Sequence, residues 1–361
     1  MMENNILING LFLISKGGIE RFSYELVKRL SSENKFRFVI LVPDRKLNQD
    51  QVNAFPEHIE IEIVPGKGGV LWSQIFLPFY IYKKYYGSLL VNLGNYAPVI
   101  YNHNLTIVHD IIPLVRPHWI SLKPLIYSWL LLPLTILRSK KICTGCNNVK
   151  EILAKYFFRK NIDIIHSASN WTAEKIQIDN YSEKSIIDGK YILCVASNDP
   201  RKNLNRLIQS FVKLNRDGLK LYLVTKNLDG FEKWIPREME NEIIATGWVT
   251  DNELVNIYKN AELFVFPSLI EGFGIPPIEA MSLGCPVLAS NKSCIPEICG
   301  DAAVYFNPYN IVEMSDKISM ILDDQKLKKD LIELGKVRAK RYSWDQSVRQ
   351  LVNVIKCCCK K

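Results

Sequence analysis

The stretch "FVFPSLIEGFGIPPIEAMSLGCPVLAS", residues 264–290, places two short apolar runs on either side of a loop rich in glycine and proline. Unbroken apolar runs of this kind are typical of strands in a parallel sheet that helices cover on both faces. Pro276 and Pro277 suit the first positions of a helix between the two runs. The stretch therefore predicts a strand, a loop, a helix and a second strand, with Glu271 leaving the first strand and Glu279 in the first helical turn.

The same alternation of apolar runs and helical patterns extends along the chain. Helical spacing is clear at Ile19, Phe22, Leu26 and Leu30. Strand-like runs are "NILINGLFL", "FRFVILVP", "IEIEIVP", "SLLVNLG" and "LTIVHDI" in the first half, and "YILCVASN", "LKLYLVTK", "EIIATGWV" and "AAVYF" in the second. A chain of 361 residues is long for one core. Two series of such runs predict an α/β protein of two Rossmann-like domains, with a seam near residues 162–175.

Composition and cysteine usage indicate a cytoplasmic protein with anionic partners. Lys and Arg outnumber Asp and Glu by 46 to 37, a net charge of +9. Glu3 stands where a signal peptide carries basic residues, so we expect a first strand and no export signal. Cys143 and Cys146 form a C-x-x-C without a second pair or nearby histidines, which is weak evidence for a metal or redox site. The residues Cys357–Cys359 do not match a prenylation box.

The most apolar segment runs from Pro124 to Leu137 and is too short to span a bilayer. The favoured interpretation is a buried helix with charged ends. The alternative is contact with an acidic membrane surface, because Lys123, Arg138, Lys140 and Lys141 flank the segment.

Two loops that follow strands in the first half carry candidate site residues. Gly17 and Gly18 open a helix, where backbone amides can approach an anion, and a plain tight turn is the alternative. His109 and Asp110 end a buried strand, where a polar pair needs partners or a ligand. A histidine satisfied within the core is the alternative there.

Two further loops stand out in the second half. Arg201 and Lys202 lie where a helix begins, a position that the helix dipole disfavours for cations unless an anion such as phosphate binds. A solvated basic turn is the alternative, and we expect Lys202 at a cleft surface. Glu271 and Glu279 flank backbone amides near Phe273. Carboxylates around free amides suit a ligand with many hydroxyls, although a glutamate in a first helical turn is often only a dipole partner.

The stretch over residues 264–290 resembles the signature of family 4 glycosyltransferases, which are retaining enzymes with a GT-B fold. Its E-x7-E spacing, glycine-rich turn and following "EAM" all match. The resemblance extends to "SNDPRKNLNRLIQSF", "GWVTDNELVNIYKNA", "SCIPEICGDAAVYFNP", "GGIERFSYELVKRL" and "VHDIIPL". It departs from the usual pattern at Cys143–Cys146 and Ser167–Asn170, near the acceptor side or the hinge.

The resemblance implies two facing domains with a cleft between them. We expect an acceptor-side domain over residues 1–168 and a nucleotide-sugar-binding domain over 169–340. A terminal helix with a basic, cysteine-rich tail, residues 341–361, is expected to return to the first domain.

The resemblance also implies roles for the donor-side residues. Glu279 would bind the ribose, and Glu271 would lie against the donor sugar. Arg201 and Lys202 would hold the diphosphate and stabilise its departure. The backbone of the short run Phe273, Gly274 and Ile275 would contact sugar and phosphate.

On the first domain, the Gly17–Gly18 loop would close on the donor, according to the same resemblance. His109 would contact the sugar near the reacting carbon, and Asp110 would help place the acceptor.

The resemblance implies a retaining hexosyltransferase that needs no cofactor or metal, since the chain has no Asp-x-Asp pair. The donor would be a nucleotide-diphosphate sugar, with a lean to GDP-mannose. The acceptor would be a glycan or polyprenyl-linked oligosaccharide in surface-polysaccharide synthesis. We expect no nucleic-acid partner, and a peripheral place on the inner face of the cell membrane. The alternatives are a non-catalytic homologue that binds sugar nucleotides, and a sugar-nucleotide epimerase.

Overall fold

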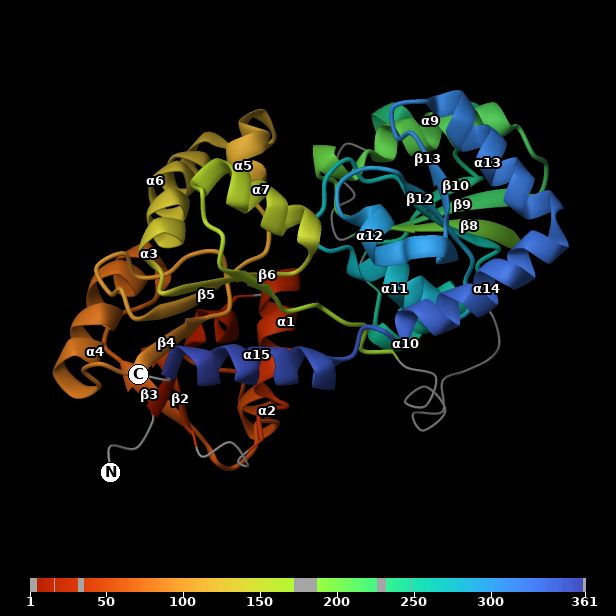
Figure 1. The fold of residues 1–361 in the computed structure, drawn as a ribbon. Coiled ribbons are helices and arrows are strands. Elements are labelled where there is room, and N and C mark those ends of the chain that lie inside the picture. Colours follow the sequence, from red (N-terminus) through yellow and green to blue (C-terminus); the bar gives the residue numbers. More distant parts are fainter. Residues whose placement is uncertain are drawn as a thin grey trace. The chain divides into compact units, whose positions relative to one another are not determined.

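The structure is a computed structural model that describes residues 5–15, 17–31, 36–171, 187–225, 232–247 and 249–359. The chain divides into two compact units, residues 1–167 with 344–361 and residues 168–343. Each unit is built around its own parallel sheet with helices on both faces (Figure 1). The α/β fold class is confirmed.

The described part of the first unit contains a sheet in the order β3-β2-β1-β4-β5-β6-β7. All its neighbouring strands pair in parallel, and Ile8 of β1 lies opposite Ile40 of β2 and Val91 of β4. The strands are β1 (Asn5–Asn9), β2 (Arg37–Pro43), β3 (Ile59–Val64), β4 (Leu89–Asn92), β5 (Asn104–Val108), β6 (Lys141–Thr144) and β7 (Ile162–Ile164). The strand order reverses between β1 and β4, and in open parallel sheets ligands bind beyond the carboxyl ends at such a point.

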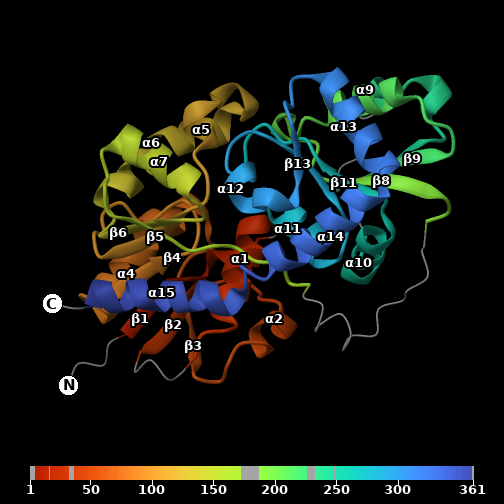
Figure 2. The same cartoon turned by 45° about the vertical axis from the view of Figure 1, so that its right-hand side comes forward.

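The helices of the first unit include one that comes from the far end of the chain. They are α1 (Gly18–Val27), α2 (Gln49–Asn53), α3 (Gly69–Leu71), α4 (Leu77–Lys84), α5 (Ile112–Val115), α6 (Leu122–Arg138), α7 (Asn147–Phe157) and α15 (Trp344–Cys359), with the short 3₁₀ turns η1 (Gly10–Leu13) and η4 (Pro117–Trp119) and a π-helix, η3 (Trp72–Phe76), between α3 and α4. The last helix, α15, runs beside α1 in both views (Figures 1 and 2). Its Ser347 donates to the His166 carbonyl at 2.6 Å, and the His166 amide donates to Gln350 at 3.1 Å. The Cys357–Cys359 run forms the last turn of this helix, so these cysteines are not a separate tail.

Two elements of the first unit end earlier than the apolar pattern predicts. β1 stops at Asn9, because the Asn9 side chain accepts from the Leu11 amide at 3.3 Å and starts the tight turn η1. Helix α1 stops at Val27, although Leu30 is buried beyond its end.

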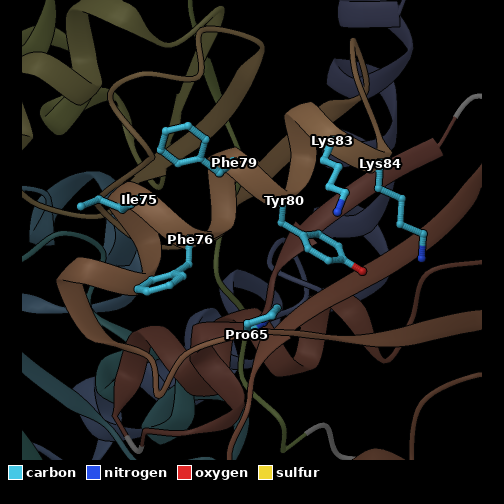
Figure 3. A pocket seen from close by; sticks show the side chains of 7 residues that line it. All are labelled: Pro65, Ile75, Phe76, Phe79, Tyr80, Lys83 and Lys84. Atoms are coloured by element: carbon cyan, nitrogen blue, oxygen red, sulfur yellow. The ribbon is translucent and has the colours of Figure 1, made fainter.

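Helix α6 buries only one side, so the prediction of a buried helix is wrong for its other side. Leu125, Leu132 and Ile136 are buried, whereas Leu130 is 63% exposed and Leu137 is 57% exposed. Within the described residues, no helix is long and apolar enough to cross a bilayer. Helix α4 is similar, since Phe79 and Tyr82 are exposed and its side chains line an open groove (Figure 3).

The described part of the second unit contains a parallel sheet in the order β10-β9-β8-β11-β12-β13. Its strands are β8 (Lys190–Val195), β9 (Leu219–Val224), β10 (Ile243–Ala245), β11 (Leu263–Phe266), β12 (Val287–Ser290) and β13 (Val304–Phe306). Its helices are α9 (Leu204–Leu214), α10 (Asp251–Asn260), α11 (Ile275–Ser282), α12 (Ile295–Cys299), α13 (Ile311–Asp323) and α14 (Gln325–Ala339), with short turns η5 (Pro200–Lys202), η6 (Glu232–Trp234), η7 (Arg237–Met239) and η8 (Gly300–Ala302). Its order reverses between β8 and β11, and the loops after these two strands carry Arg201, Lys202 and Glu271.

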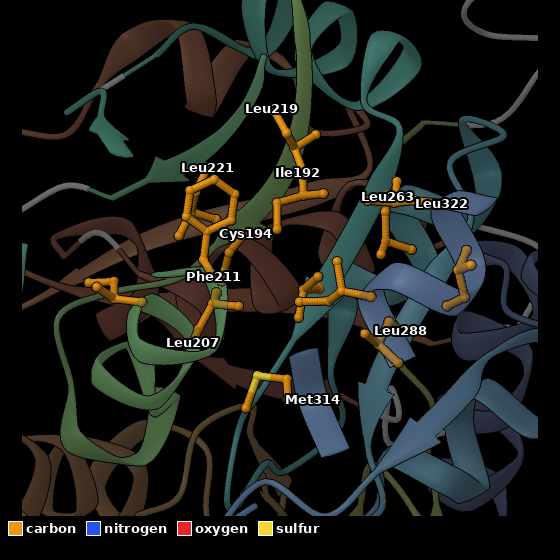
Figure 4. Packing of buried hydrophobic residues seen from close by; sticks show 14 of the residues in the cluster. Ile192, Cys194, Leu207, Phe211, Leu219, Leu221, Leu263, Leu288, Met314 and Leu322 are labelled. Carbon is orange, nitrogen blue, oxygen red and sulfur yellow. The ribbon is translucent and has the colours of Figure 1, made fainter. Parts of the chain in front are cut away.

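The core of the second unit forms where α9 packs on the sheet. Leu204, Leu207, Ile208 and Phe211 recur every three or four residues and are buried, which places them on one side of α9. Figure 4 shows Leu207 and Phe211 beside strand residues and Met314 of α13. This packing fixes the start of α9, and therefore the turn before it that carries Arg201 and Lys202.

Candidate active site

Arg201 and Lys202 lie on the turn η5, between β8 and α9. The Asp199 carboxylate starts this turn, because it accepts from the Arg201 amide at 3.0 Å and from Arg201 Nε at 3.1 Å. Asn203 follows with φ of 59°, and its side-chain amide donates to the carbonyls of Pro267 at 3.2 Å and Pro308 at 2.7 Å. The asparagine therefore ties the turn to the chain that follows β11.

Glu271 joins the two cations. Its Oε2 accepts from Arg201 Nη1 at 2.8 Å, and its Oε1 accepts from Lys202 Nζ at 2.5 Å. Burial by itself would raise the pKa of Glu271, but the charges of Lys202 and Arg201 hold that pKa below its usual value. The glutamate is therefore ionised, and it places two cations side by side at the point where the strand order reverses.

Lys202 was expected at a cleft surface, but the structure buries it, with only 9% of the residue accessible. Lys202 Nζ lies 5.6 Å from the centre of the Phe266 ring and is ion-paired with Glu271. Arg201 is more open, with 24% of its side chain exposed. Of the two cations, Arg201 has more surface available to a ligand.

The Glu271 loop is held from both sides. The Leu269 amide donates to the Arg201 carbonyl at 2.8 Å. The Glu271 amide donates to Ser293 Oγ at 3.2 Å, and the Cys294 thiol contacts the Phe273 carbonyl at 3.2 Å. These bonds fix the backbone before and after the glutamate, so its carboxylate position is set by the fold.

Glu279 lies one residue past the first turn of α11, which corrects the predicted position. The helix begins at Ile275, before the two prolines, because Gly274 takes φ of 94° and turns the chain into it. Glu279 is therefore the fifth residue of the helix. It is buried, and its carboxylate accepts from the Tyr258 hydroxyl at 3.3 Å.

In the run Phe273–Ile275, Phe273 and Gly274 are buried and Ile275 is half-buried. The ring of Phe273 meets that of Tyr342 edge to face at 5.4 Å between centroids.

Three residues that contact the site were not predicted from the sequence: Tyr258, Ser293 and Tyr342. Asp199 was also missed, although an aspartate two residues before an arginine in "DPRK" is a recognisable turn signal.

Gly17 and Gly18 stand at the start of α1, as the sequence predicts. Gly17 is extended and precedes the helix, and Gly18 is its first residue. The carboxylate of Glu20 lies at this helix start, where Ser15 Oγ donates to it at 2.9 Å. A Cβ added at Gly17 would come within 2.5 Å of Glu20 Oε2. The chain's own carboxylate therefore occupies the position predicted for an external anion.

His109 is satisfied inside the first unit on one ring nitrogen. Its Nε2 lies 2.8 Å from the Leu93 carbonyl, and its ring meets Phe22 edge to face at 4.8 Å between centroids. Burial lowers the pKa of His109, although the Leu93 carbonyl and the charges of Asp110 and Glu20 oppose this. A neutral ring must donate from Nε2 to the carbonyl, so Nδ1 is the acceptor nitrogen.

Asp110 shapes the backbone beside His109. Its carboxylate accepts from the Ile112 amide at 3.2 Å and so starts α5. The pKa of Tyr96 is raised, mainly by burial and also by the charge of Asp110. Asp110 thus has a structural role in addition to any contact with a ligand.

A pocket of about 500 Å³ lies where the strand order of the first unit reverses. Polar groups and an aromatic pair line it, including Glu20, Arg45, Asn95, Tyr96 and Tyr127. The two tyrosine rings meet edge to face at 4.7 Å between centroids. Carboxylate, guanidinium and amide groups beside aromatic faces can bind a polar molecule with many hydroxyls.

The structure brings together Arg201, Lys202 and Glu271 in the second unit. Glu279 and the Gly274 turn belong to the same unit, on the helix that follows the Glu271 loop. His109, Asp110 and the Gly17–Gly18 turn belong to the first unit. Glu20 lies at the Gly17–Gly18 turn, and its charge also acts on the pKa of His109.

The fold and the site define a class of protein. The GT-B fold expected from sequence is confirmed, because solved glycosyltransferases superpose on almost the whole chain. A glycosyltransferase from Rickettsia africae covers 100% of both chains with a TM-score of 0.73 at 19% identity. WaaG, a glycosyltransferase of lipopolysaccharide biosynthesis, covers 97% of this chain and 99% of its own, with a TM-score of 0.67 at 13% identity.

The sequence comparisons point to the same class of protein. Residues 177–338 match the model of the family described as Glycosyl transferases group 1. The O-antigen chain mannosyltransferase B of Escherichia coli is 32% identical over 173 residues, which cover 46% of this chain and 45% of that protein. The O-antigen chain mannosyltransferase RfbU of Salmonella typhimurium is 29% identical over 273 residues, 67% and 73% of the two chains.

The matches to several curated relatives are partial. The matched region spans less than half of mannosyltransferase B and 22% of the serotype-specific mannosyltransferase WbdA of Escherichia coli.

Proposed function

We propose that this protein is a retaining glycosyltransferase that moves a hexose from a nucleotide-diphosphate sugar to a glycan or a lipid-linked oligosaccharide. The observation that carries the proposal is the Glu271 cluster, in which one buried carboxylate holds Arg201 and Lys202 at the carboxyl ends of β8 and β11. A departing diphosphate needs preorganised positive charge, and such charge acts most strongly in a partly buried site.

The proposed donor is GDP-mannose. The relatives with 29–33% identity include several named mannosyltransferases, which favours mannose over other hexoses. Glu279 would accept hydrogen bonds from the ribose, and the backbone around Gly274 would contact sugar and phosphate.

The proposed transfer uses no metal ion. Arg201 and Lys202 would stabilise the charge that develops on the leaving phosphate, and the phosphate would take the proton of the attacking hydroxyl. His109 would contact the donor sugar through its Nδ1, the nitrogen that the Leu93 carbonyl leaves as an acceptor. Because a neutral histidine is a poor general acid, we assign it a positioning role.

The proposed acceptor is a saccharide that enters the pocket of the first unit. Glu20 and Arg45 could bind its hydroxyls, and the Tyr96–Tyr127 pair could pack against a sugar ring. Transfer to a lipid-linked acceptor would take place at an acidic membrane surface.

A panel of GDP, UDP and dTDP sugars tests the proposal. The correct donor should raise Tm, because a ligand that binds only the folded state stabilises it by mass action. Slow release of free sugar from that donor would distinguish a transferase from a binding protein without activity. Conversion of the sugar into its epimer would support the epimerase alternative instead.

A further inference from the structure

The backbone of Glu271 is buried at a place where the sheet no longer supplies hydrogen-bond partners. The residue is 7% exposed. The neighbouring strands β11 and β12 form their last pair at Phe266 and Ala289, so Glu271 lies beyond the end of their ladder. A buried amide or carbonyl needs a partner, because water cannot reach it. The partners of this residue must therefore come from another loop.

The loop that follows β12 supplies these partners through two side chains. The Ser293 hydroxyl accepts from the Glu271 amide at 3.2 Å and donates to the Glu271 carbonyl at 2.9 Å. In a parallel sheet, the neighbouring strand would bond these two groups with its own peptides. The next residue, Cys294, is buried and places its sulfur 3.3 Å from the same carbonyl and 3.2 Å from the Phe273 carbonyl. The two loops therefore stay joined past the end of the ladder.

The backbone of Ser293 is strained. Its φ is 58°, in the left-handed region, where the Cβ atom of an L-residue crowds the backbone. Among the described residues, the other non-glycine positions with positive φ are Phe158, Asn203 and Asn215. Glycine would adopt this conformation without strain, but it has no hydroxyl. Strain of this kind persists where the surrounding fold holds a residue in place, and it is concentrated at functional sites.

We infer that Ser293 is a positioning residue for the transfer reaction and that it acts through Glu271. The Glu271 carboxylate meets Arg201 at 2.8 Å with one oxygen and Lys202 at 2.5 Å with the other. Both contacts can form together only while the backbone that carries the carboxylate stays in place. Without the Ser293 hydroxyl, the carboxylate and the two cations would shift together.

Such a shift should affect the rate of transfer more than the binding of the donor. Charge develops on the leaving diphosphate in the transition state, so the cations must be in place at that moment. A displacement of about 1 Å can lower a rate by about 10²-fold. This inference deepens the proposed function and rests on it for the effect on transfer. The contact between Ser293 and the Glu271 backbone does not depend on it.

The first test needs no donor and measures hydrogen–deuterium exchange of the Glu271 amide in the full chain. Ser293→Ala should speed this exchange at least about 10-fold, because the amide loses its acceptor. The control is Ser210→Ala, which removes a buried hydroxyl that donates to the Leu207 carbonyl at 2.8 Å in α9. It should leave exchange at Glu271 unchanged. Unchanged exchange in Ser293→Ala would overturn the inference.

The second test separates the hydroxyl from the stability of the turn, using the donor that the sugar-nucleotide panel identifies. Ser293→Thr keeps the hydroxyl but places a β-branched side chain in the left-handed region, so it should lower Tm and keep most of kcat. Ser293→Gly removes both the strain and the hydroxyl. It should have a higher Tm than Ser293→Thr, and its kcat should fall about 10- to 100-fold while KM for the donor changes much less.

The order of the variants decides between a positioning role and a purely structural one. If kcat follows Tm, so that Ser293→Gly is more active than Ser293→Thr, the inference is wrong. A rise in KM at constant kcat would also overturn it. Failure of the proposed function would look different, because the unchanged protein would then transfer from none of the donors. The role in transfer would fall with that function, and the exchange measurement would still decide whether Ser293 holds Glu271.

Discussion

Lys202 Nζ lies 2.5 Å from Glu271 Oε1, and the two residues come from loops that follow different strands of the second unit. The same carboxylate holds Arg201 through its other oxygen. One ionised glutamate therefore positions both cations before any ligand arrives. A diphosphate would find the positive charge already in place, and this preorganisation is what lowers the cost of charge development in a transition state.

Removing the negative charge of Glu271 should destabilise the second unit. In Glu271→Gln, Lys202 and Arg201 lose their shared partner while Lys202 stays buried, and breaking a buried pair costs about 3–5 kcal/mol. Urea unfolding should show a loss of that order. The control is Glu333→Gln, which breaks the exposed pair with Lys336 and should cost less than about 1 kcal/mol. Equal stability of the two variants would contradict a central role for Glu271.

Substitution of Lys202 or Arg201 should lower mainly the turnover number, kcat. Removing one electrostatic donor to a developing charge typically costs about 10²–10³-fold in rate. Lys202→Ala should therefore lower kcat by about that factor and, since the residue is buried, also lower Tm. Arg201→Lys should reduce kcat because an ammonium cannot form the planar fork. Arg216→Lys, on an exposed pair with Asp323, is the control and should leave kcat unchanged. A rise in KM with constant kcat would assign both cations to ground-state binding.

Metal removal should leave transfer intact. The mechanism proposed above places the charge stabilisation on Arg201 and Lys202, so product should form at the same rate in excess EDTA. Complete loss of transfer in EDTA, restored by Mg²⁺ or Mn²⁺, would require a different mechanism.

Glu279 should contribute to binding of the nucleotide. A hydrogen bond to a charged group contributes about 1.5–3 kcal/mol, so Glu279→Gln should weaken donor affinity by up to that amount in calorimetry. Tyr258→Phe is the companion variant, because it removes the hydroxyl that donates to this carboxylate at 3.3 Å without changing the carboxylate. It should alter affinity less than Glu279→Gln does. Unchanged affinity in Glu279→Gln would exclude contact with the nucleotide.

The free energy of unfolding should decrease as pH is lowered through the range in which His109 takes up a proton. Burial lowers its pKa in the folded state below the ordinary value of 6.5, so the unfolded chain binds its proton first as pH falls. The folded state therefore loses stability below pH 6.5. His103 also has a lowered pKa, mainly through burial, so His109→Gln and His103→Gln should each flatten the curve of Tm against pH. Glu271 acts in a separate range, because its stabilisation is lost only below its ordinary value of 4.5. A curve in His109→Gln identical to that of the unchanged protein would show that His109 titrates normally.

The sequence by itself determined the class of fold and the order of the strands along the chain. Unbroken apolar runs alternate with amphipathic helical segments. Strands that are apolar on both faces must be covered on both faces, so this pattern favours parallel sheets packed between helices. The spacing of Glu271 and Glu279, the glycines between them and the basic turn at Arg201 identified the donor-side residues, because these side-chain types follow predicted strands. Local chemistry of this kind can be inferred from neighbours in the chain.

Only the tertiary structure decided which of these residues touch. The contact of Glu271 with Arg201 and Lys202 spans about seventy positions of sequence, and it exists because β8 and β11 are neighbours in the sheet. The contact of Tyr258 with Glu279 also depends on tertiary packing, because the two residues lie on different helices, α10 and α11. The exposed side of α6 was also decided by packing, since an apolar helix buries only the side that meets a neighbour, and the sequence of "PLIYSWLLLPLTIL" is apolar all round.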